Sequence, residues 1–358
     1  MIEQPVTSKR IRVLVVDDSA FMRVALARLL ASDPGIEVID TAHTGTEAVK
    51  KVLELQPDVV TMDVEMPGMN GLAALREIMH KRPTPVLMVS SLTTEGAQAT
   101  LEALELGAVD FIPKQLSQVS LDIVRIQPAL VAKVRAAAAA RPRAITRPAS
   151  GAAPARWTVR PDSRVKRLNA IAIGSSTGGP KALQEVIPNL PARLSIPVLV
   201  VQHMPPTFTG PMADRLNRLS AVNVKEAVDG EPLISGTVYI APGGWHLEVS
   251  KQGALCYVKL SKTPAEVPHI PSVDVMMLSV ARSYAGSVLG IILTGMGSDG
   301  LQGMTEIKRK GGVTIAQDEQ TSCVYGMPQA CVQKGVVDYI LPLNQVADAV
   351  RALTSGVS

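Results

Sequence analysis

Ile171-Ala172-Ile173-Gly174-Ser175-Ser176-Thr177-Gly178-Gly179-Pro180 joins a short apolar run to a turn rich in Gly and Ser. Apolar residues at helical spacing follow, so the stretch predicts a strand, a tight turn and a helix. Gly174-x-Ser176-x-Gly178 fits the nucleophile-elbow pattern, in which small neighbours let a serine sit on a sharp turn with its hydroxyl exposed. The N–H groups at the start of the next helix can stabilise an oxyanion. A turn that binds a phosphate fits these residues equally well, so the stretch alone leaves both interpretations open.

The second half of the chain continues this alternation of strands and helices. Apolar runs predict further strands at residues 197–201, 287–293, 313–316 and 336–340. Helices are expected at residues 211–219 and 273–284. Four short, turn-rich segments look like an antiparallel addition: residues 222–227, 237–240, 247–249 and 255–260. We therefore expect a Rossmann-like, doubly wound α/β domain with a few antiparallel strands.

Three polar residues each follow a predicted strand of this domain. Ser176, His203 and Asp299 would supply a nucleophile, a general base and an orienter for that base. Their order along the chain differs from the order Ser, Asp, His of an α/β-hydrolase, which argues against that fold. A turn histidine and a helix-capping aspartate remain open alternatives at this point. His246 is the best rival histidine, whereas Cys323 has no histidine near it in sequence and is an unlikely nucleophile. The histidines show no metal-ligand spacing.

The first third of the chain predicts five strands that alternate with five helices, the last helix at residues 121–135. This pattern favours a parallel sheet covered on both faces, with its chemistry at the carboxyl ends of the strands. The polar residues expected there are Asp17, Asp18, Asp63, Ser90 and Lys114. Three convergent carboxylates repel one another unless a divalent cation lies among them, and Mg²⁺ prefers oxygen ligands. Asp63 can then act as a nucleophile toward phosphorus, and Lys114 can neutralise the added charge.

Composition excludes several other classes of protein. The 358 residues are 46% apolar, which supports two or three domains with sizeable cores. The three cysteines have no disulfide or metal spacing, which suits a reducing cytosol. We expect no signal peptide and no membrane span, since the N-terminus is polar and no apolar run reaches 18 residues. The net charge of the whole chain is +4, but residues 137–167 alone carry +7 and the remaining residues carry −3. The basic charge therefore lies in a Pro/Arg/Ala-rich linker rather than on a nucleic-acid-binding face.

The motifs of the first third resemble the receiver domain of two-component response regulators. They are Val16-Asp-Asp-Ser19, Met62-Asp-Val-Glu-Met-Pro-Gly-Met-Asn-Gly71, Val89-Ser-Ser91 and Asp110-Phe-Ile-Pro-Lys114. The resemblance implies a flavodoxin-like (βα)₅ fold. It also implies a phosphoryl acceptor (Asp63), Mg²⁺ ligands (Asp17, Asp18 and Asp63), residues that report phosphorylation (Ser90 and Phe111) and a phosphate-contacting lysine (Lys114). Gln115 replaces the proline that usually follows this lysine, so the loop geometry there is open.

The second half resembles the chemotaxis methylesterase domain. The resemblance rests on Ile173-Gly-Ser-Ser-Thr-Gly-Gly-Pro180, Gln202-His-Met-Pro205, Pro271-Ser-Val-Asp-Val275, Leu293-Thr-Gly-Met-Gly-Ser-Asp-Gly300 and Tyr325-Gly-Met-Pro-Gln-Ala330. It implies a catalytic serine, base and orienter (Ser176, His203 and Asp299) and oxyanion donors in the backbone (the N–H of Met296 or Thr177). Mild departures from the family occur at Ser175, Ser298 and Gly243-Gly244-Trp245, which can alter receptor preference.

Together the resemblances predict a receiver domain at residues 10–132, a flexible linker at 133–166 and a methylesterase domain at 167–355. They imply a cytoplasmic, phosphorylation-activated protein-glutamate methylesterase that releases methanol from chemoreceptors and also deamidates receptor glutamines. The expected partners are a histidine kinase and methylated receptor cytoplasmic domains. We expect Mg²⁺ in the receiver, no cofactor in the esterase reaction, no nucleic acid and a monomer. The alternative is a phosphorylation-gated binding module with an idle esterase site; a DNA-binding regulator lacks a helix-turn-helix after the linker.

Overall fold

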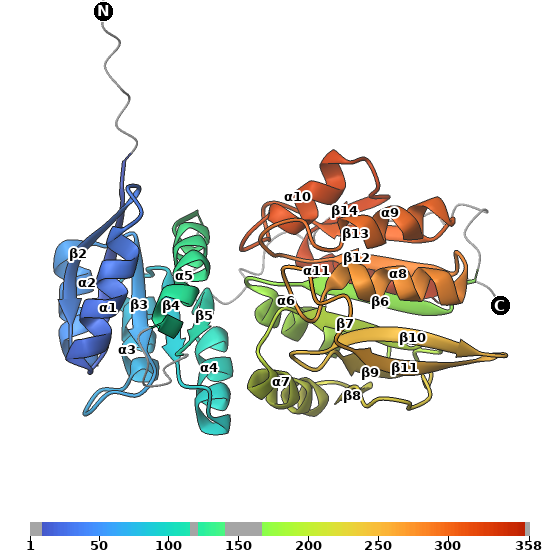
Figure 1. Ribbon diagram of the computed structural model, residues 1–358, viewed down its shortest axis with the longest axis horizontal. Coiled ribbons are helices and arrows are strands. Elements are labelled where there is room, and N and C mark those ends of the chain that lie inside the picture. The colour runs from blue at the N-terminus through green and yellow to red at the C-terminus, as the bar shows by residue number, and fades with distance from the viewer. Residues whose placement is uncertain (1–8, 115–120, 140–166, 355–358) are drawn as a thin grey trace, which may run out of the picture. The chain divides into compact units, whose positions relative to one another are not determined.

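The computed structural model describes residues 9–114, 121–139 and 167–354, which fall into two compact units on either side of the predicted linker (Figure 1). Each unit is an α/β domain built on a parallel sheet. Gln115, residues 140–166 of the predicted linker and residue 355 lie outside the described residues.

The N-terminal unit is a five-stranded parallel sheet in the order β2-β1-β3-β4-β5. Its strands are β1 (Ile11–Val16), β2 (Ile36–Ala42), β3 (Val59–Asp63), β4 (Val86–Ser90) and β5 (Asp110–Pro113). Its helices are α1 (Ala20–Ala31), α2 (Gly45–Leu55), α3 (Gly71–Lys81), α4 (Thr94–Glu105) and α5 (Leu121–Ala139). Helices α1 and α5 cover one face, while α2, α3 and α4 pack side by side on the other. The strand order confirms the predicted flavodoxin-like fold.

Helix α5 is longer than expected. The sequence pattern ended this helix near Arg135 and began the linker at residue 133, but the helix continues to Ala139. Alanine has the highest helix propensity of all residues, so an alanine run extends a helix that is already formed. Val134 and Ala137 are also fully buried against the α1 face of the sheet. Residues 133–139 therefore belong to the folded unit.

The C-terminal unit is a seven-stranded parallel sheet in the order β14-β13-β12-β6-β7-β9-β8. Its strands are β6 (Ala170–Ser175), β7 (Val198–Gln202), β8 (Asn223–Glu226), β9 (Thr237–Ile240), β12 (Val288–Ile292), β13 (Val313–Gln317) and β14 (Tyr339–Leu341). Its helices are α6 (Gly179–Val186), α7 (Pro206–Leu219), α8 (Val273–Tyr284), α9 (Leu301–Arg309), α10 (Gly326–Gln333) and α11 (Leu343–Thr354), with a short 3₁₀ turn, η1 (Ile187–Asn189).

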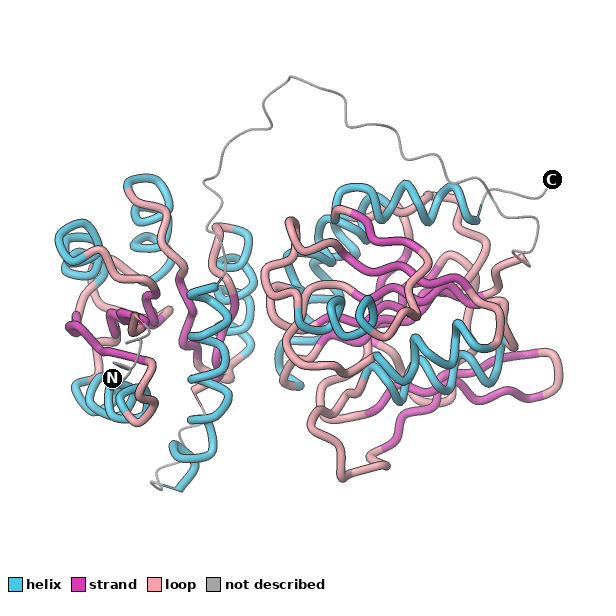
Figure 2. Tube along the Cα trace, turned by 90° about the horizontal axis from the view of Figure 1, so that it is seen from above, coloured by secondary structure: helices cyan, strands magenta, loops and turns pink. Residues whose placement is uncertain are grey.

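Helices cover both faces of this sheet (Figure 2). Helices α8, α9 and α10 share one core with the sheet, and α6, α7 and α11 pack together with the 3₁₀ turn. The core is mostly aliphatic, since aromatic residues are only 3% of the chain, and it includes Val273, Met276 and Met277 from α8. The chain leaves β6 toward β7 on one side and returns at β12 on the other. This reversal is the type of point at which open α/β sheets form their sites.

The predicted antiparallel addition is only half correct. The segments β10 (His246–Gln252) and β11 (Leu255–Ser261) form an antiparallel hairpin that packs against α8. Strands β8 and β9 instead extend the main sheet in parallel beyond β7. All four residues of β9 are buried, which suits an interior parallel strand. Short strands show their own period but not their pairing partner, so the sequence did not distinguish these two arrangements.

Candidate functional site

Three adjacent strands carry the predicted catalytic residues of the C-terminal unit. Strand β6 lies between β7 and β12, and Ser176, His203 and Asp299 follow β6, β7 and β12 respectively. Backbone hydrogen bonds join the three loops: the Ser176 N–H donates to the Thr294 carbonyl at 3.0 Å, and the His203 N–H donates to Ser175 at 3.2 Å. The structure therefore places all three residues at one edge of the sheet, as their positions in the sequence predicted.

His203 and Asp299 form a close pair. The His203 Nε2 lies 2.8 Å from the Asp299 Oδ2, and the two side chains are 8% and 15% exposed. A carboxylate only accepts hydrogen bonds, so this contact assigns the ring proton to Nε2. The remaining nitrogen, Nδ1, is buried and has no hydrogen-bond partner among the described residues. Nδ1 is therefore the atom available as a base. In the Ser-His-Asp triad of chymotrypsin-like proteases, by contrast, the carboxylate binds Nδ1 and Nε2 is the base.

Asp299 is held ionised by four donors. Besides His203, these are the Ser272 hydroxyl at 2.9 Å, the Val273 N–H at 2.7 Å and the Asp274 N–H at 2.9 Å. Burial opposes the charge, but the bond to His203 and the backbone N–H groups outweigh it and lower the pKa of Asp299 to about 2. A carboxylate with this pKa keeps the histidine oriented and stabilises it when it becomes protonated.

Sequence reasoning missed the role of Ser272. Ser272 caps α8, where its hydroxyl accepts the Val275 N–H, and the same hydroxyl donates to Asp299. The capping role has a local signature, a serine followed by Asp274 in the first turn. The bond to Asp299 has none, because the two residues are 27 positions apart.

His246, the rival histidine, is a buried supporting residue. Its Nδ1 accepts the Ser272 N–H at 3.1 Å, and its Nε2 lies 3.0 Å from the Pro264 carbonyl. Both ring nitrogens are therefore occupied by backbone groups, and the side chain is fully buried. His246 fixes the segment that carries Ser272 instead of acting as a base.

Gln202 joins the elbow to the histidine loop and was also missed as a site residue. Its Nε2 donates to the carbonyls of Ser176 at 2.9 Å and His203 at 3.1 Å. Its Oε1 accepts a hydrogen bond from the Ser175 hydroxyl at 2.7 Å. Ser175, one of the residues that depart from the family pattern, therefore has a buried hydrogen-bond partner. A Cβ on Gly179 would lie 1.9 Å from this Oε1, which explains the glycine.

The backbone around the elbow is tightly packed. Gly178 has φ +75°, so a side chain there would be strained, and it precedes α6 without a side-chain cap. The Gly179 N–H at the start of the helix donates to the Ser176 carbonyl at 2.8 Å. Thr177 is 2% exposed and Met296 is 38% exposed. A Cβ on Gly295 would lie 2.9 Å from the Ser176 Cβ, which brings the loop before Met296 against the nucleophile. The role of Thr177 or Met296 as oxyanion donor stays a prediction.

Three other residues singled out in the sequence are Cys323, Trp245 and Ser298. Cys323 packs beside the elbow, since a Cβ on Gly178 would lie 2.5 Å from the Cys323 Cβ. Trp245 is 40% exposed, and the Lys262 ammonium lies 4.5 Å from its ring centroid. Ser298 is exposed in the loop after β12. Nothing in these contacts disturbs the His203–Asp299 pair.

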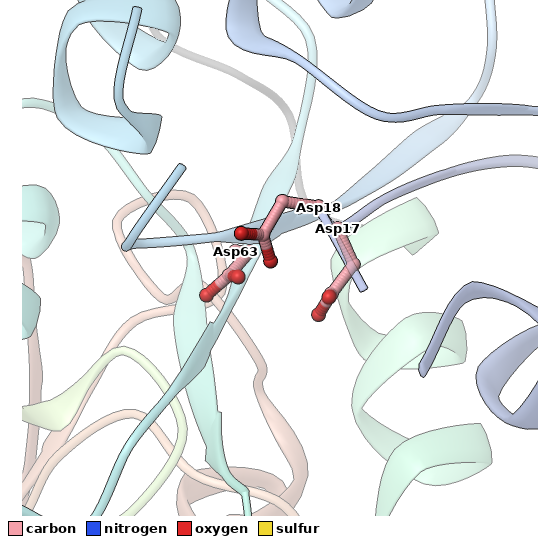
Figure 3. Close-up of side chains that lie close together, drawn as sticks. All are labelled: Asp17, Asp18 and Asp63. Carbon is pink, nitrogen blue, oxygen red and sulfur yellow. The ribbon is translucent and has the colours of Figure 1, made fainter. Parts of the chain in front are cut away.

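The predicted acidic cluster of the N-terminal unit is present. Asp17 and Asp18 follow β1, Asp63 ends β3, and one oxygen from each lies within 4.8 Å of the others (Figure 3). Lys114 follows β5, and its ammonium lies 3.0 Å from Asp17 and 2.7 Å from Asp63. Burial raises the pKa of Asp63 to about 6, although Lys114 acts in the opposite direction.

This donor set fits Mg²⁺. Asp17 and Asp63 are buried, Asp18 is exposed, and the carboxylate oxygens are the hard ligands that this ion prefers. Three carboxylates beside the Lys114 ammonium leave an excess of negative charge that a divalent cation would neutralise. Asp17, Asp18 and Asp63 are therefore the residues that would hold the ion.

Ser90 and Phe111 are both buried near this cluster. The Ser90 hydroxyl donates to the Gly96 carbonyl at 3.1 Å and accepts a bond from Thr100 at 2.6 Å, so it is engaged with α4. The Lys133 ammonium lies 5.6 Å from the centroid of the Phe111 ring. Their part in signalling stays a prediction.

Comparison with known proteins supports the family resemblances predicted for both halves of the chain. Residues 13–124 match the model of the response regulator receiver domain, and residues 171–350 match the model of the CheB methylesterase. The chain is 50% identical to "Protein-glutamate methylesterase/protein-glutamine glutaminase" of Symbiobacterium thermophilum, over 97% of this chain and 98% of the relative. It is 45% identical to the protein of the same name from Pyrococcus abyssi, over 97% and 94%.

A solved structure extends this similarity to the fold. The Thermotoga maritima CheB methylesterase catalytic domain is 42% identical, with a TM-score of 0.51, and the match covers 53% of this chain and 99% of that one. Among the described residues, no helix combines the length and the apolar character needed to cross a membrane. The full-length relatives and the two domain models confirm the predicted resemblances, and the chain belongs to the CheB methylesterase family, as a hydrolase with an N-terminal receiver domain.

Proposed function

We propose that this chain hydrolyses the methyl esters of glutamate side chains on chemoreceptors, releasing methanol, and deamidates receptor glutamines. One observation carries the proposal. The His203 Nε2 is bound to an ionised Asp299, and its Nδ1 is left without a partner among the described residues, on the loop next to the elbow serine. The names of the relatives, which state both activities, support the same conclusion.

The proposed reaction follows from these groups. The Ser176 Oγ attacks the ester carbonyl while the His203 Nδ1 accepts its proton. The backbone N–H of Met296 or Thr177 stabilises the oxyanion. The tetrahedral intermediate collapses, the methoxide takes the proton from His203, and methanol leaves. His203 then deprotonates a water molecule, which attacks the acyl-enzyme and releases the glutamate carboxylate and Ser176. A glutamine amide follows the same course and releases ammonia. In this proposal, side chains and backbone supply the nucleophile, the base and the oxyanion donors, and water completes the hydrolysis.

The receiver domain is proposed to control this reaction. A histidine kinase donates a phosphoryl group to an oxygen of Asp63, and the Lys114 ammonium, 2.7 Å from Asp63, faces the added charge. When Mg²⁺ is bound by Asp17, Asp18 and Asp63, it supplies charge neutralisation for the phosphoryl group. Ser90 and Phe111 respond to the phosphorylated state. We propose that the unphosphorylated receiver docks over Ser176 and so restricts access to it. The charge added at Asp63 then weakens this docking.

The setting follows from the substrate. We propose methylated receptor cytoplasmic domains and a chemotaxis histidine kinase as the partners, and a cytoplasmic monomer that binds no nucleic acid. We propose that the departure from the family at Gly243-Gly244-Trp245, where Trp245 is exposed and contacts Lys262, influences which receptors are served.

The decisive experiment measures methanol release from methyl-labelled receptor membranes, with and without a small phosphodonor plus Mg²⁺. Wild type, Ser176→Ala and Asp63→Asn are compared. We expect phosphodonor to stimulate the wild type, Ser176→Ala to release nothing, and Asp63→Asn to keep only basal release. A chain that begins near Asn169 should be more active than the unphosphorylated full chain. Equal activity of these two would refute the restriction by the receiver, and no release under any condition would favour the idle binding module.

A further inference from the structure

The orientation of the His203 ring is not explained by its hydrogen bond alone. The bond from Nε2 to Asp299 fixes the position of one ring atom. The imidazole torsion is broad, so a single bond leaves the ring free to tilt about that contact. The Nδ1 atom, on the far side of the ring, has no partner among the described residues that would prevent such a tilt. A base that must meet the Ser176 hydroxyl needs its ring plane held by something else.

His269 supplies a contact on the face of this ring. The His203 and His269 rings are stacked, with centroids 4.1 Å apart and an interplanar angle of 26°. His269 is an exposed residue, whereas the His203 side chain is only 8% exposed. Stacked aromatic pairs attract each other beyond the effect of their buried area. The outer ring therefore restrains the tilt of the inner one.

The segment that carries His269 is itself anchored at the site. The Ile270 carbonyl accepts the Gly244 N–H at 3.2 Å, and the Ser272 N–H donates to His246 at 3.1 Å. Two residues after Ile270, the Ser272 hydroxyl binds Asp299 at 2.9 Å. One short segment thus sets both the stacking ring and a donor to the acid partner of His203.

We propose that His269 is a positioning residue, whose stacked ring holds the His203 imidazole in the plane that presents Nδ1 to Ser176. This inference rests on the proposed function, because it takes His203 as the base. The aromatic face is the required property, and an ionisable nitrogen at position 269 is not.

The test uses the full chain with three substitutions: His269→Ala, His269→Leu and His269→Phe. Leucine keeps bulk without an aromatic face, and phenylalanine keeps the face without a titratable nitrogen. We expect Ala and Leu to lower kcat for methanol release roughly tenfold, from the energy of an aromatic pair, with KM little changed. Phe should restore most of kcat. His80→Ala, an exposed histidine of α3 in the receiver, is the matched control and should equal wild type.

A second measurement separates this inference from the proposed substrate. Phenylmethanesulfonyl fluoride sulfonylates an activated serine: the Ser176 Oγ forms the O–S bond, fluoride leaves, and His203 takes the proton. The rate should fall in Ala and Leu and recover in Phe, even if receptor membranes release no methanol. Unchanged rates in His269→Ala, equal losses in Phe and Ala, or a rise in KM with kcat unchanged would each overturn the positioning role. Urea midpoints of the variants establish that they are folded.

Discussion

Asp299 and Asp274 are neighbouring half-buried carboxylates whose pKa values are shifted in opposite directions, and this contrast yields a sharp prediction. The bonds to Asp299 outweigh its burial and lower its pKa from 3.8 to about 2. Asp274 accepts the Gly303 N–H at 2.8 Å, but burial dominates and raises its pKa from 3.8 to about 6. Asn substitutions at the two positions remove the charge with little change of shape. They should therefore change stability at pH 7 in opposite directions.

The magnitudes follow from the shifts, at about 1.4 kcal/mol for each pKa unit. A lowered carboxyl pKa stabilises the fold above its unfolded value, and that contribution is lost as the pH falls from about 4 toward 2. Asp299→Asn should thus cost roughly 2–3 kcal/mol at pH 7. A raised carboxyl pKa gives the reverse: stability is lost as the pH rises from about 4 through 6. Asp274→Asn should be neutral or stabilising at pH 7, by up to roughly 3 kcal/mol.

Urea unfolding followed by tryptophan emission measures both effects in the full chain. The two tryptophans, Trp157 and Trp245, lie outside residues 10–132, so the signal does not come from the receiver. The free energies of unfolding are compared at pH 7 and pH 5, where the advantage of Asp274→Asn should shrink. Equal destabilisation by both variants, or a stabilising Asp299→Asn, would refute the electrostatic account. Asp299→Asn should also reduce kcat by on the order of 10³- to 10⁴-fold, because the ring loses its orienting acceptor.

Three further outcomes are expected. Asp63→Asn should raise the free energy of unfolding of the receiver at pH 7 by up to roughly 3 kcal/mol, seen as a higher calorimetric midpoint, because burial raises the pKa of Asp63 to about 6 and disfavours its ionised form; a lower midpoint would mean that the pair with Lys114 dominates. Gly179→Ala should lower both kcat and the urea midpoint, since the added Cβ would lie 1.9 Å from the Gln202 Oε1; wild-type values for both would show that the elbow can relax. EDTA should prevent phosphodonor stimulation but leave basal methanol release intact, and a loss of basal release would contradict a metal-free esterase reaction.

Local sequence placed the candidate residues of each site after the strands that carry them. Ser176, His203 and Asp299 each follow an apolar run, and so do Asp17 and Asp63. In parallel sheets the carboxyl ends of the strands meet at one edge, so a polar residue directly after a strand is placed without knowledge of its neighbours. The same reasoning predicted the alternation of strands and helices in both units, because hydrophobic period is a local property.

Tertiary structure alone decided how those residues act on one another. Asp299 binds the Nε2 of His203 although the two residues are 96 positions apart in the chain. His269 stacks on His203 from a separate loop. The parallel pairing of β8 and β9 and the burial of Ala137 in a longer α5 were likewise outside the local pattern. Each depends on contacts between distant segments, whose energies have no counterpart in the period or spacing of a single segment.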